Sequence, residues 1–192
     1  MPHSGGLWYL FGLIAHLYKP LARPRLIFLL AFVFPILGVL WWWGMLASAS
    51  IEVLELAPQR YAYLSAQGAY SKLSTKRSEV AEALHQQGYA PGRSLTLIYD
   101  DPRTTPTEQR RARTGFVIAA DAPIRAPLIA DTIPARRVLV AKVRAHPLFA
   151  YGKAYAALLD YLEQHGESLR MPTLEFYDGS VLTVEMTLEN SL

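Results

Sequence analysis

Leu95-Thr-Leu-Ile-Tyr-Asp100 is followed 78 positions later by a similar stretch, Thr173-Leu-Glu-Phe-Tyr-Asp178. At the same offset, five positions carry identical residues: Leu84, Gln86, Gly88, Tyr99 and Asp100 match Leu162, Gln164, Gly166, Tyr177 and Asp178. This repetition indicates that one supersecondary unit occurs twice in the chain. Within the repeated strand, Glu175 takes the place of Leu97. A carboxylate at a position where the other copy keeps leucine is a candidate for a functional role.

The periodicity of apolar residues predicts a β-α-β-β order in each copy. In the first copy we expect strands at 61–66, 95–99 and 116–119, with a helix at 74–87 that Gly88 ends. In the second copy we expect strands at 137–143, 174–177 and 181–188, with a helix from Leu148 that ends at Gly166. A further strand lies near 51–56, and Pro123, Pro127 and Pro134 mark a linker between the copies.

Because neither unit could bury its sheet alone, we expect both to share one antiparallel sheet. The predicted fold is α+β, with the copies at about 51–122 and 133–190 inside a domain at 50–192. Helices cover one face of the sheet, and a ligand cleft lies on the other. Alternation along the strands directs Leu182, Val184 and Met186 to the helices and Glu185 away from them, where we interpret it as a rim or solvent residue. The cleft face then collects six candidate ligand-binding residues: Tyr61, Tyr63, Leu97, Tyr99, Glu175 and Tyr177.

The N-terminal part differs in composition from the rest. Residues 26–46 form an uncharged, almost wholly apolar run, which predicts a transmembrane helix at 26–47. Residues 1–25 form a cytoplasmic or interfacial segment, with an interfacial helix at 7–18. Lys19, Arg23 and Arg25 precede the run, and Glu52 and Glu55 follow it. The positive-inside rule therefore predicts a single-pass protein of a bacterial inner membrane, with a cytoplasmic N-terminus and a periplasmic domain.

A sequence like a signal-peptidase site, Ala47-Ser-Ala49, follows the run. Cleavage there would release the domain, but the apolar run is longer than the core of a signal peptide. We favour an uncleaved anchor in contact with the lipid bilayer.

Charge and residue usage exclude several classes of function. The net charge of +3 belongs to the first 49 residues, and the remainder is neutral, so the chain lacks the basic surface that nucleic-acid binding requires. There is no cysteine, and the histidines show no metal-ligand spacing. The sequence predicts no metal, no cofactor and no nucleophilic triad, so no residue is assigned a catalytic role.

Several short motifs make the region from about 52 to 188 similar to a known family. They are YLSAQGAY at 63–70, IYDDP at 98–102, Arg111 leading into Gly115, Ile133-Pro134, and PTLEFY at 172–177. Their order and spacing resemble the GyrI-like small-molecule-binding domain of the SOUL/GyrI-like superfamily, the drug-sensing module of multidrug regulators. The resemblance implies a duplicated β-α-β-β fold with a ligand cleft between the copies, and an acidic residue at Glu175 that contacts cationic lipophilic compounds. The chain departs from the family at Arg144-Ala-His146-Pro147 and at Tyr161, where tryptophan is common.

Three functions follow as alternatives. The first is a membrane-anchored protein that captures small amphipathic or cationic compounds in an aromatic cleft with a central glutamate. The second is a small-molecule hydrolase that uses the cleft glutamate and a tyrosine. The third is a non-catalytic module that docks a protein partner, whose identity the sequence does not give. Binding without turnover is the function that we favour.

Overall fold

The computed structural model describes residues 23–188, which belong to two compact units that meet between Trp42 and Trp43. The interfacial helix predicted at 7–18 lies outside the described residues. The first unit contains one described helix, α2 (Arg23–Trp42), and the second contains the sheet and all other described elements. We describe each unit separately.

The transmembrane helix predicted at 26–47 is not supported. Within residues 23–188, no helix combines the length and the hydropathy needed to cross a membrane. The uncharged part of α2 runs from Leu26 to Trp42, which is 17 residues. At 1.5 Å per residue this part reaches about 25 Å, whereas a hydrocarbon core is about 30 Å thick.

The apolar run exceeds the helix because its last residues fold against the sheet unit. Trp43 stacks on the His146 ring at 4.4 Å between centroids, and its carbonyl accepts a hydrogen bond of 2.8 Å from the His146 amide. Gly44 adopts a φ of +80°, and a Cβ there would lie 3.0 Å from Ala145. Trp43, which falls inside the predicted transmembrane helix, therefore packs within the second unit.

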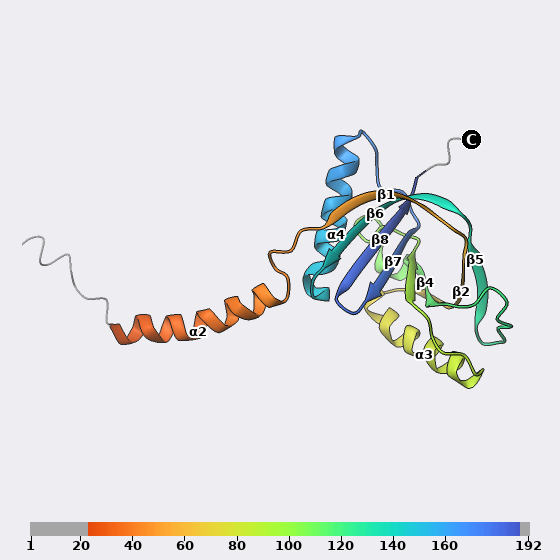
Figure 1. Cartoon of the computed structure of the whole chain (residues 1–192), viewed down its shortest axis with the longest axis horizontal. Helices are drawn as coiled ribbons and strands as arrows, with labels where there is room; N and C mark the ends of the chain where they lie inside the picture. The colour runs from red at the N-terminus through yellow and green to blue at the C-terminus, as the bar shows by residue number, and fades with distance from the viewer. Residues whose placement is uncertain (1–22, 189–192) are drawn as a thin grey trace, which may run out of the picture. The chain divides into compact units, whose positions relative to one another are not determined.

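The second unit is built on one antiparallel sheet of eight strands in the order β1-β6-β8-β7-β3-β4-β2-β5, as predicted for the fold class (Figure 1). The strands are β1 (Ser50–Leu56), β2 (Gln59–Gln67), β3 (Ser94–Ile98), β4 (Arg111–Val117), β5 (Ile129–Ile133), β6 (Arg136–Arg144), β7 (Thr173–Asp178) and β8 (Val181–Thr187). The helices are α3 (Leu73–Gln86) and α4 (Pro147–Gln164), with short 3₁₀ helices η1 (Tyr70–Lys72) and η2 (Thr107–Gln109). The pairing of β3 with β7 joins β2-β4-β3 of the first copy to β7-β8-β6 of the second.

The leading strand of each copy pairs with the other copy. β1 pairs with β6, and β5 pairs with β2. The two ladders share one continuous register. Leu56 lies opposite Arg136, and Gln59 lies opposite Ile133, so both sides of the ladder advance by three residues between the two pairs. Pro58 and Pro134 lie in the gap between these ladders. Strand pairing needs no backbone N–H there, so proline is tolerated. β5 occupies the region that the sequence predicted to be only a linker, a difference explained by its short length and mostly exposed side chains.

The two helices end with the same geometry. Gly88 and Gly166 adopt φ of +84° and +67°, which confirms the predicted stops. The amide of the following residue donates to the carbonyl of the last buried leucine in each case: Tyr89 to Leu84 at 2.9 Å, and Glu167 to Leu162 at 2.8 Å. The offset of 78 residues between the two copies therefore holds for both helices and for the glycines that end them. His146 caps the start of α4 by accepting from the Leu148 amide, and Pro147 follows as the first helical residue.

Three apolar clusters hold the unit together. α4 packs on β6 and β8, burying Leu158 and Leu162 against strand residues that include Leu182, Val184 and Met186, which confirms the predicted direction of these side chains. α3 packs on β2 and β4 through Val80 and Leu84. The third cluster lies on the opposite face of the sheet and contains Tyr61, Tyr63, Leu95, Leu97, Ile133, Leu174 and Phe176.

Gly115 provides a test of the packing between β2 and β4. A Cβ at this position would lie 1.9 Å from the Ala62 carbonyl oxygen, so Gly115→Ala must displace a central strand. We expect the free energy of unfolding to fall by about 2–4 kcal/mol in denaturant titrations. Gly152→Ala is the matched control, because nothing lies within 4 Å of its Cβ position in α4, and it should raise stability by up to about 1 kcal/mol. Equal stability of Gly115→Ala and the wild type would contradict this packing.

Candidate functional site

A cavity of about 550 Å³ lies between α3 and α4, above the adjoining strands β3 and β7. Its lining is mostly apolar and aromatic, and it includes Tyr70, Leu73, Ile98, Pro102, Tyr151, Tyr155, Leu159, Leu169 and Met171. The polar and charged residues around it are Ser71, Ser74, Arg77, Thr96, Asp101, Arg103 and Glu175. The predicted cleft on the face opposite the helices is therefore wrong: the cavity lies on the helix face.

The base of the cavity lies on the pseudo-twofold axis that relates the copies. Glu175 on β7 lies directly opposite Thr96 on β3. From Gly88 to the start of β3 the chain advances six positions, whereas from Gly166 to the start of β7 it advances seven. This extra residue changes the offset from 78 in the helices to 79 in the strands. The structural counterpart of Glu175 is thus Thr96, and Leu97 faces the opposite side with Leu174, its own cross-strand partner.

The walls of the cavity come from corresponding positions of the two helices. At the offset of 78, Leu73, Ser74 and Arg77 of α3 correspond to Tyr151, Gly152 and Tyr155 of α4, and all six residues line the cavity. The first copy therefore supplies a leucine and an arginine where the second supplies two tyrosines. Together with Thr96 and Glu175, these differences make a symmetric frame chemically asymmetric.

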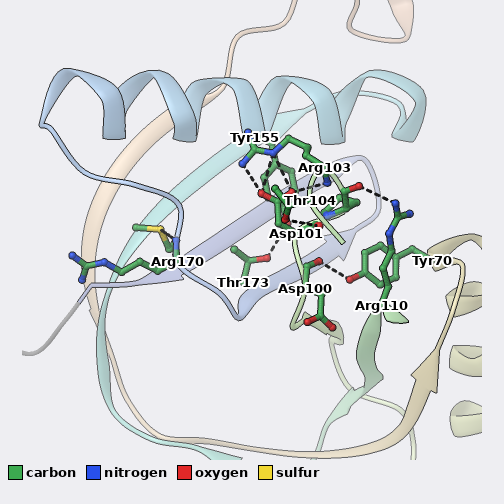
Figure 2. Close-up of polar contacts among 11 residues, drawn as sticks. Tyr70, Asp100, Asp101, Arg103, Thr104, Arg110, Tyr155, Arg170 and Thr173 are labelled. Carbon is green, nitrogen blue, oxygen red and sulfur yellow. Dashed lines mark hydrogen bonds and ion pairs between the residues drawn. The ribbon is translucent and has the colours of Figure 1, made fainter. Parts of the chain in front are cut away.

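A short hydrogen-bond chain orients Glu175. The Tyr155 hydroxyl donates to Glu175 Oε1 at 2.6 Å. The same hydroxyl lies 2.9 Å from Thr173 Oγ1, from which it can accept (Figure 2 shows Tyr155 and Thr173). Thr173 is fully buried on the same face of β7, two residues before Glu175. Within residues 23–188, no arginine, lysine or histidine forms an ion pair with Glu175. The carboxylate therefore has a fixed orientation and no ion-pair partner among the described residues.

Burial changes the acidity of the groups at the base. Desolvation raises the pKa of Glu175 to about 7, although the hydrogen bond from Tyr155 opposes this rise. The pKa of Tyr155 is also raised, first by burial and then by the nearby Glu175 charge. At neutral pH, Glu175 is thus close to half-ionised, and Tyr155 remains a hydrogen-bond donor.

A rigid loop forms one side of the cavity mouth. Asp101 accepts hydrogen bonds from the Arg103 guanidinium at 2.6–3.0 Å, so these two charges neutralise each other. Arg110 donates to the carbonyls of Pro102 at 2.8 Å and Thr105 at 2.9 Å. The Tyr70 hydroxyl donates to the Asp100 carbonyl at 2.7 Å (Figure 2). These bonds hold Asp101, Pro102 and Arg103 against the cavity.

The structure brings only Glu175 of the six predicted site residues into this cavity. Tyr61, Tyr63 and Leu97 are buried in the cluster on the opposite face, with Tyr99 packed against it. There, Arg113 lies over the Tyr63 ring at 4.5 Å and donates to the Tyr61 hydroxyl at 3.1 Å. Tyr177 shares the face of Glu175, but it stacks on Tyr151 and donates to the Ala145 carbonyl. Glu185, expected at the rim, is buried in an ion pair with Arg136.

Sequence reasoning missed the helix residues of the site. Tyr151 and Tyr155 belong to the apolar stripe of α4, whose periodicity predicts a helix but gives no role to its individual residues. Arg77 of α3 belongs to no motif in the sequence. The feature of the sequence that could have predicted these residues is the offset of 78 between the copies. It makes Arg77 the counterpart of Tyr155 and places both on the helices next to the repeated strands. Within residues 23–188, no group of three or more histidine, aspartate or glutamate side chains could hold a metal ion.

The comparison with protein families identifies this domain. The model of the GyrI-like small-molecule-binding domain matches residues 49–185, and the chain therefore belongs to this family. Comparison with curated proteins finds no match.

Solved structures share the fold at low identity. The C-terminal domain of EcmrR has a TM-score of 0.58 and 14% identity, covering 76% of this chain and 99% of that one. EcmrR in a DNA complex has a TM-score of 0.60 and 13% identity, covering 87% and 68%. A protein from Listeria innocua described as a hydrolase has a TM-score of 0.54 and 7% identity, covering 74% and 93%. At these identities, the likeness concerns the fold.

The raised pKa of Glu175 makes a prediction about stability in the absence of ligand. Between about pH 4.5 and 7, the unfolded chain releases a proton that the folded protein keeps, so this group lowers stability as pH rises through that window. Glu175→Gln removes the free-energy cost of ionising a buried carboxyl group, and the amide oxygen can still accept the hydrogen bond from Tyr155. We expect the variant to be more stable than the wild type by about 3 kcal/mol near pH 8 and equal to it near pH 4. Chemical denaturation at both pH values measures the difference.

The control is Glu163→Gln, which changes an exposed carboxylate of α4 outside the cavity. This variant should match the wild type at both pH values. A stability difference for Glu175→Gln that does not depend on pH would show that the carboxylate is not desolvated.

Proposed function

We propose that this domain binds small amphipathic or cationic compounds in the cavity between α3 and α4, and that Glu175 contacts their positive charge. One observation carries the proposal: Glu175 lies at the base of a mostly apolar cavity and, among the described residues, has no cationic partner. An ionised carboxylate in such a place is destabilising until a cation accompanies it. A bound cation supplies the missing countercharge.

The surrounding side chains suit the apolar part of such a ligand. Tyr70, Tyr151 and Tyr155 offer aromatic faces, to which a cation is attracted by the ring quadrupole. Leucine, isoleucine and methionine side chains supply apolar area, and the volume of about 550 Å³ is within the range of small-molecule sites. The description of the family as small-molecule binding supports the same class of function.

A hydrolase is the second candidate, because one observation favours it. A carboxyl group with a pKa near 7 and a tyrosine hydroxyl 2.6 Å away have the properties of a general acid–base pair. Listeria innocua proteins with this fold are described as hydrolases. We rank binding first because the family is described as small-molecule binding. A module that only docks a protein would not need the open cavity.

Nucleic-acid binding is not part of the proposal. EcmrR occurs in a complex with DNA, but residues 50–192 of this chain carry equal numbers of basic and acidic residues. A neutral domain gains little from neutralising phosphates. The absence of a nucleic-acid partner therefore stays a prediction.

The binding proposal predicts a pH-dependent affinity for a lipophilic cation. With the full chain in lipid nanodiscs, 4-phenylbutyltrimethylammonium should bind about tenfold more tightly near pH 8 than near pH 6, because Glu175 ionises across this interval. Glu175→Gln should weaken binding near pH 8 by about tenfold to a hundredfold and remove the pH dependence. Isothermal titration calorimetry against empty nanodiscs measures both effects.

Glu163→Gln should bind like the wild type, since that carboxylate is outside the cavity. If Glu175→Gln binds the cation as the wild type does, the role assigned to Glu175 is wrong. Turnover of an ester or epoxide probe that is lost in both Glu175→Gln and Tyr155→Phe would instead favour the hydrolase.

The second part of the proposal is that residues 1–49 together, and not α2 alone, hold the domain at the bacterial inner membrane, on its periplasmic side. The side chains of α2 expose apolar surface: Phe28 is 79% exposed, Phe34 69% and Trp42 84%. A helix that is apolar on all sides is unfavourable in water and favourable against lipid. Lys19, Arg23 and Arg25 precede the uncharged part of α2, and Glu52 and Glu55 follow the helix, which supports a cytoplasmic N-terminus.

Fractionation of bacterial cells tests this attachment. The full chain should sediment with the membranes, and the paired change Leu30→Glu and Phe34→Glu should move it to the supernatant, because two charges in α2 oppose burial in lipid. The paired change Val53→Glu and Leu54→Glu is the control, since it adds the same charges to exposed residues of β1. Protease added to spheroplasts should cleave the domain. A wild-type chain in the supernatant would contradict the attachment, and a protected domain would contradict its side.

A further inference from the structure

Four charged residues line the cavity, and only two of them are paired with each other. Asp101 and Arg103 form an ion pair at the mouth. Glu175 and Arg77 remain, and within residues 23–188 neither of them forms an ion pair, while Arg77 also forms no hydrogen bond. One negative and one positive group therefore face the same mostly apolar space.

These two groups lie on different sides of the cavity. Arg77 is on α3 and Glu175 is on β7, where Tyr155 of α4 holds it. Burial is the main cause of the raised pKa of Tyr151, the Glu175 carboxylate adds to the rise, and the Arg77 guanidinium opposes it. For Glu175 itself, the shift comes from burial and Tyr155, with no contribution from Arg77. Both charges therefore affect the pKa of Tyr151, but no ion pair joins Arg77 to Glu175.

The duplication explains how this arrangement arises. Arg77 occupies on α3 the position that Tyr155 occupies on α4, so the two helices present different chemistry to a shared cavity. One wall carries a donor that fixes the carboxylate, and the corresponding wall carries a fixed positive charge. A ligand that spans the cavity meets both.

We infer that the preferred ligand is a zwitterionic amphiphile, with an ammonium group that contacts Glu175 and an anionic group that contacts Arg77. This inference rests on the proposed function and narrows its ligand class. A simple lipophilic cation satisfies Glu175 but leaves Arg77 unmatched and is repelled by it. A carboxylate, sulfonate or phosphate on the same molecule forms a charge-assisted hydrogen bond with the guanidinium. Arg77 is thereby assigned as the residue that determines specificity.

A matched trio of probes tests the inference. The probes are 4-phenylbutyltrimethylammonium, the betaine N-(4-phenylbutyl)-N,N-dimethylglycine and 6-phenylhexanoate, which share an apolar part and differ in charge. Calorimetry with the full chain in lipid nanodiscs near pH 8 should show the betaine bound about tenfold more tightly than the cation. The anion should bind more weakly than either.

Arg77→Gln should weaken betaine binding by about tenfold while leaving cation binding unchanged or improved. Lys76→Gln is the control, since it removes the same charge from the adjacent residue, which pairs with Glu79 and does not line the cavity. This control should keep the wild-type preference. Thermal melting of both variants confirms that they are folded.

The outcomes separate the two proposals. Cation binding that depends on Glu175, with a betaine-to-cation ratio that Arg77→Gln does not change, overturns this inference and leaves the proposed function in place. A wild-type preference for the cation over the betaine overturns it as well. If neither the cation nor the betaine shows an affinity that depends on Glu175, the proposed function itself fails.

Discussion

The pairing of β3 with β7 is the constraint on which the rest of the domain depends. Without it, the sheet would divide into two four-stranded sheets, β1-β6-β8-β7 and β3-β4-β2-β5, each with a newly exposed edge, and the two helices would share no cavity. Because the pairing places Thr96 opposite Glu175, the pseudo-twofold axis passes between them. The exchange of β1 and β5 between the copies reinforces the same arrangement from the outer strands. The cavity is therefore a consequence of how the copies pair.

A site on a symmetry axis gains specificity when the two copies differ there. Here the second copy supplies Tyr151, Tyr155 and Glu175, and the first supplies Leu73, Arg77 and Thr96. Tyr155 orients the carboxylate, and within residues 23–188 this carboxylate has no ion-pair partner. Burial raises its pKa, so its ionisation destabilises the ligand-free protein. A site of this kind is prepared for binding, because the ligand supplies the interaction that the protein lacks.

The sequence predicted the duplication, the antiparallel sheet and both glycine stops, because periodicity and helix-end signals are local. It placed the cavity on the wrong face because the comparison of Leu97 with Glu175 assumed a constant offset. One extra residue between Gly166 and β7 reverses strand parity, and a loop insertion of this size has no signal in the repeated residues. The sequence did not predict Tyr155 as a site residue, because a helical stripe does not show which of its members border an open space. The extent of α2 was overestimated because Trp43 is apolar and yet packs on His146.

The acidity of Glu175 tests the central claim most directly. A carbon-13 NMR titration of the Glu175 side-chain carboxyl in the full chain measures its pKa with and without a bound cation. The account predicts a value near 7 in the free protein and a clearly lower value in the complex, because the cation favours the ionised form. A pKa near the ordinary value of 4.5 in the free protein, unchanged by the cation, would contradict the account.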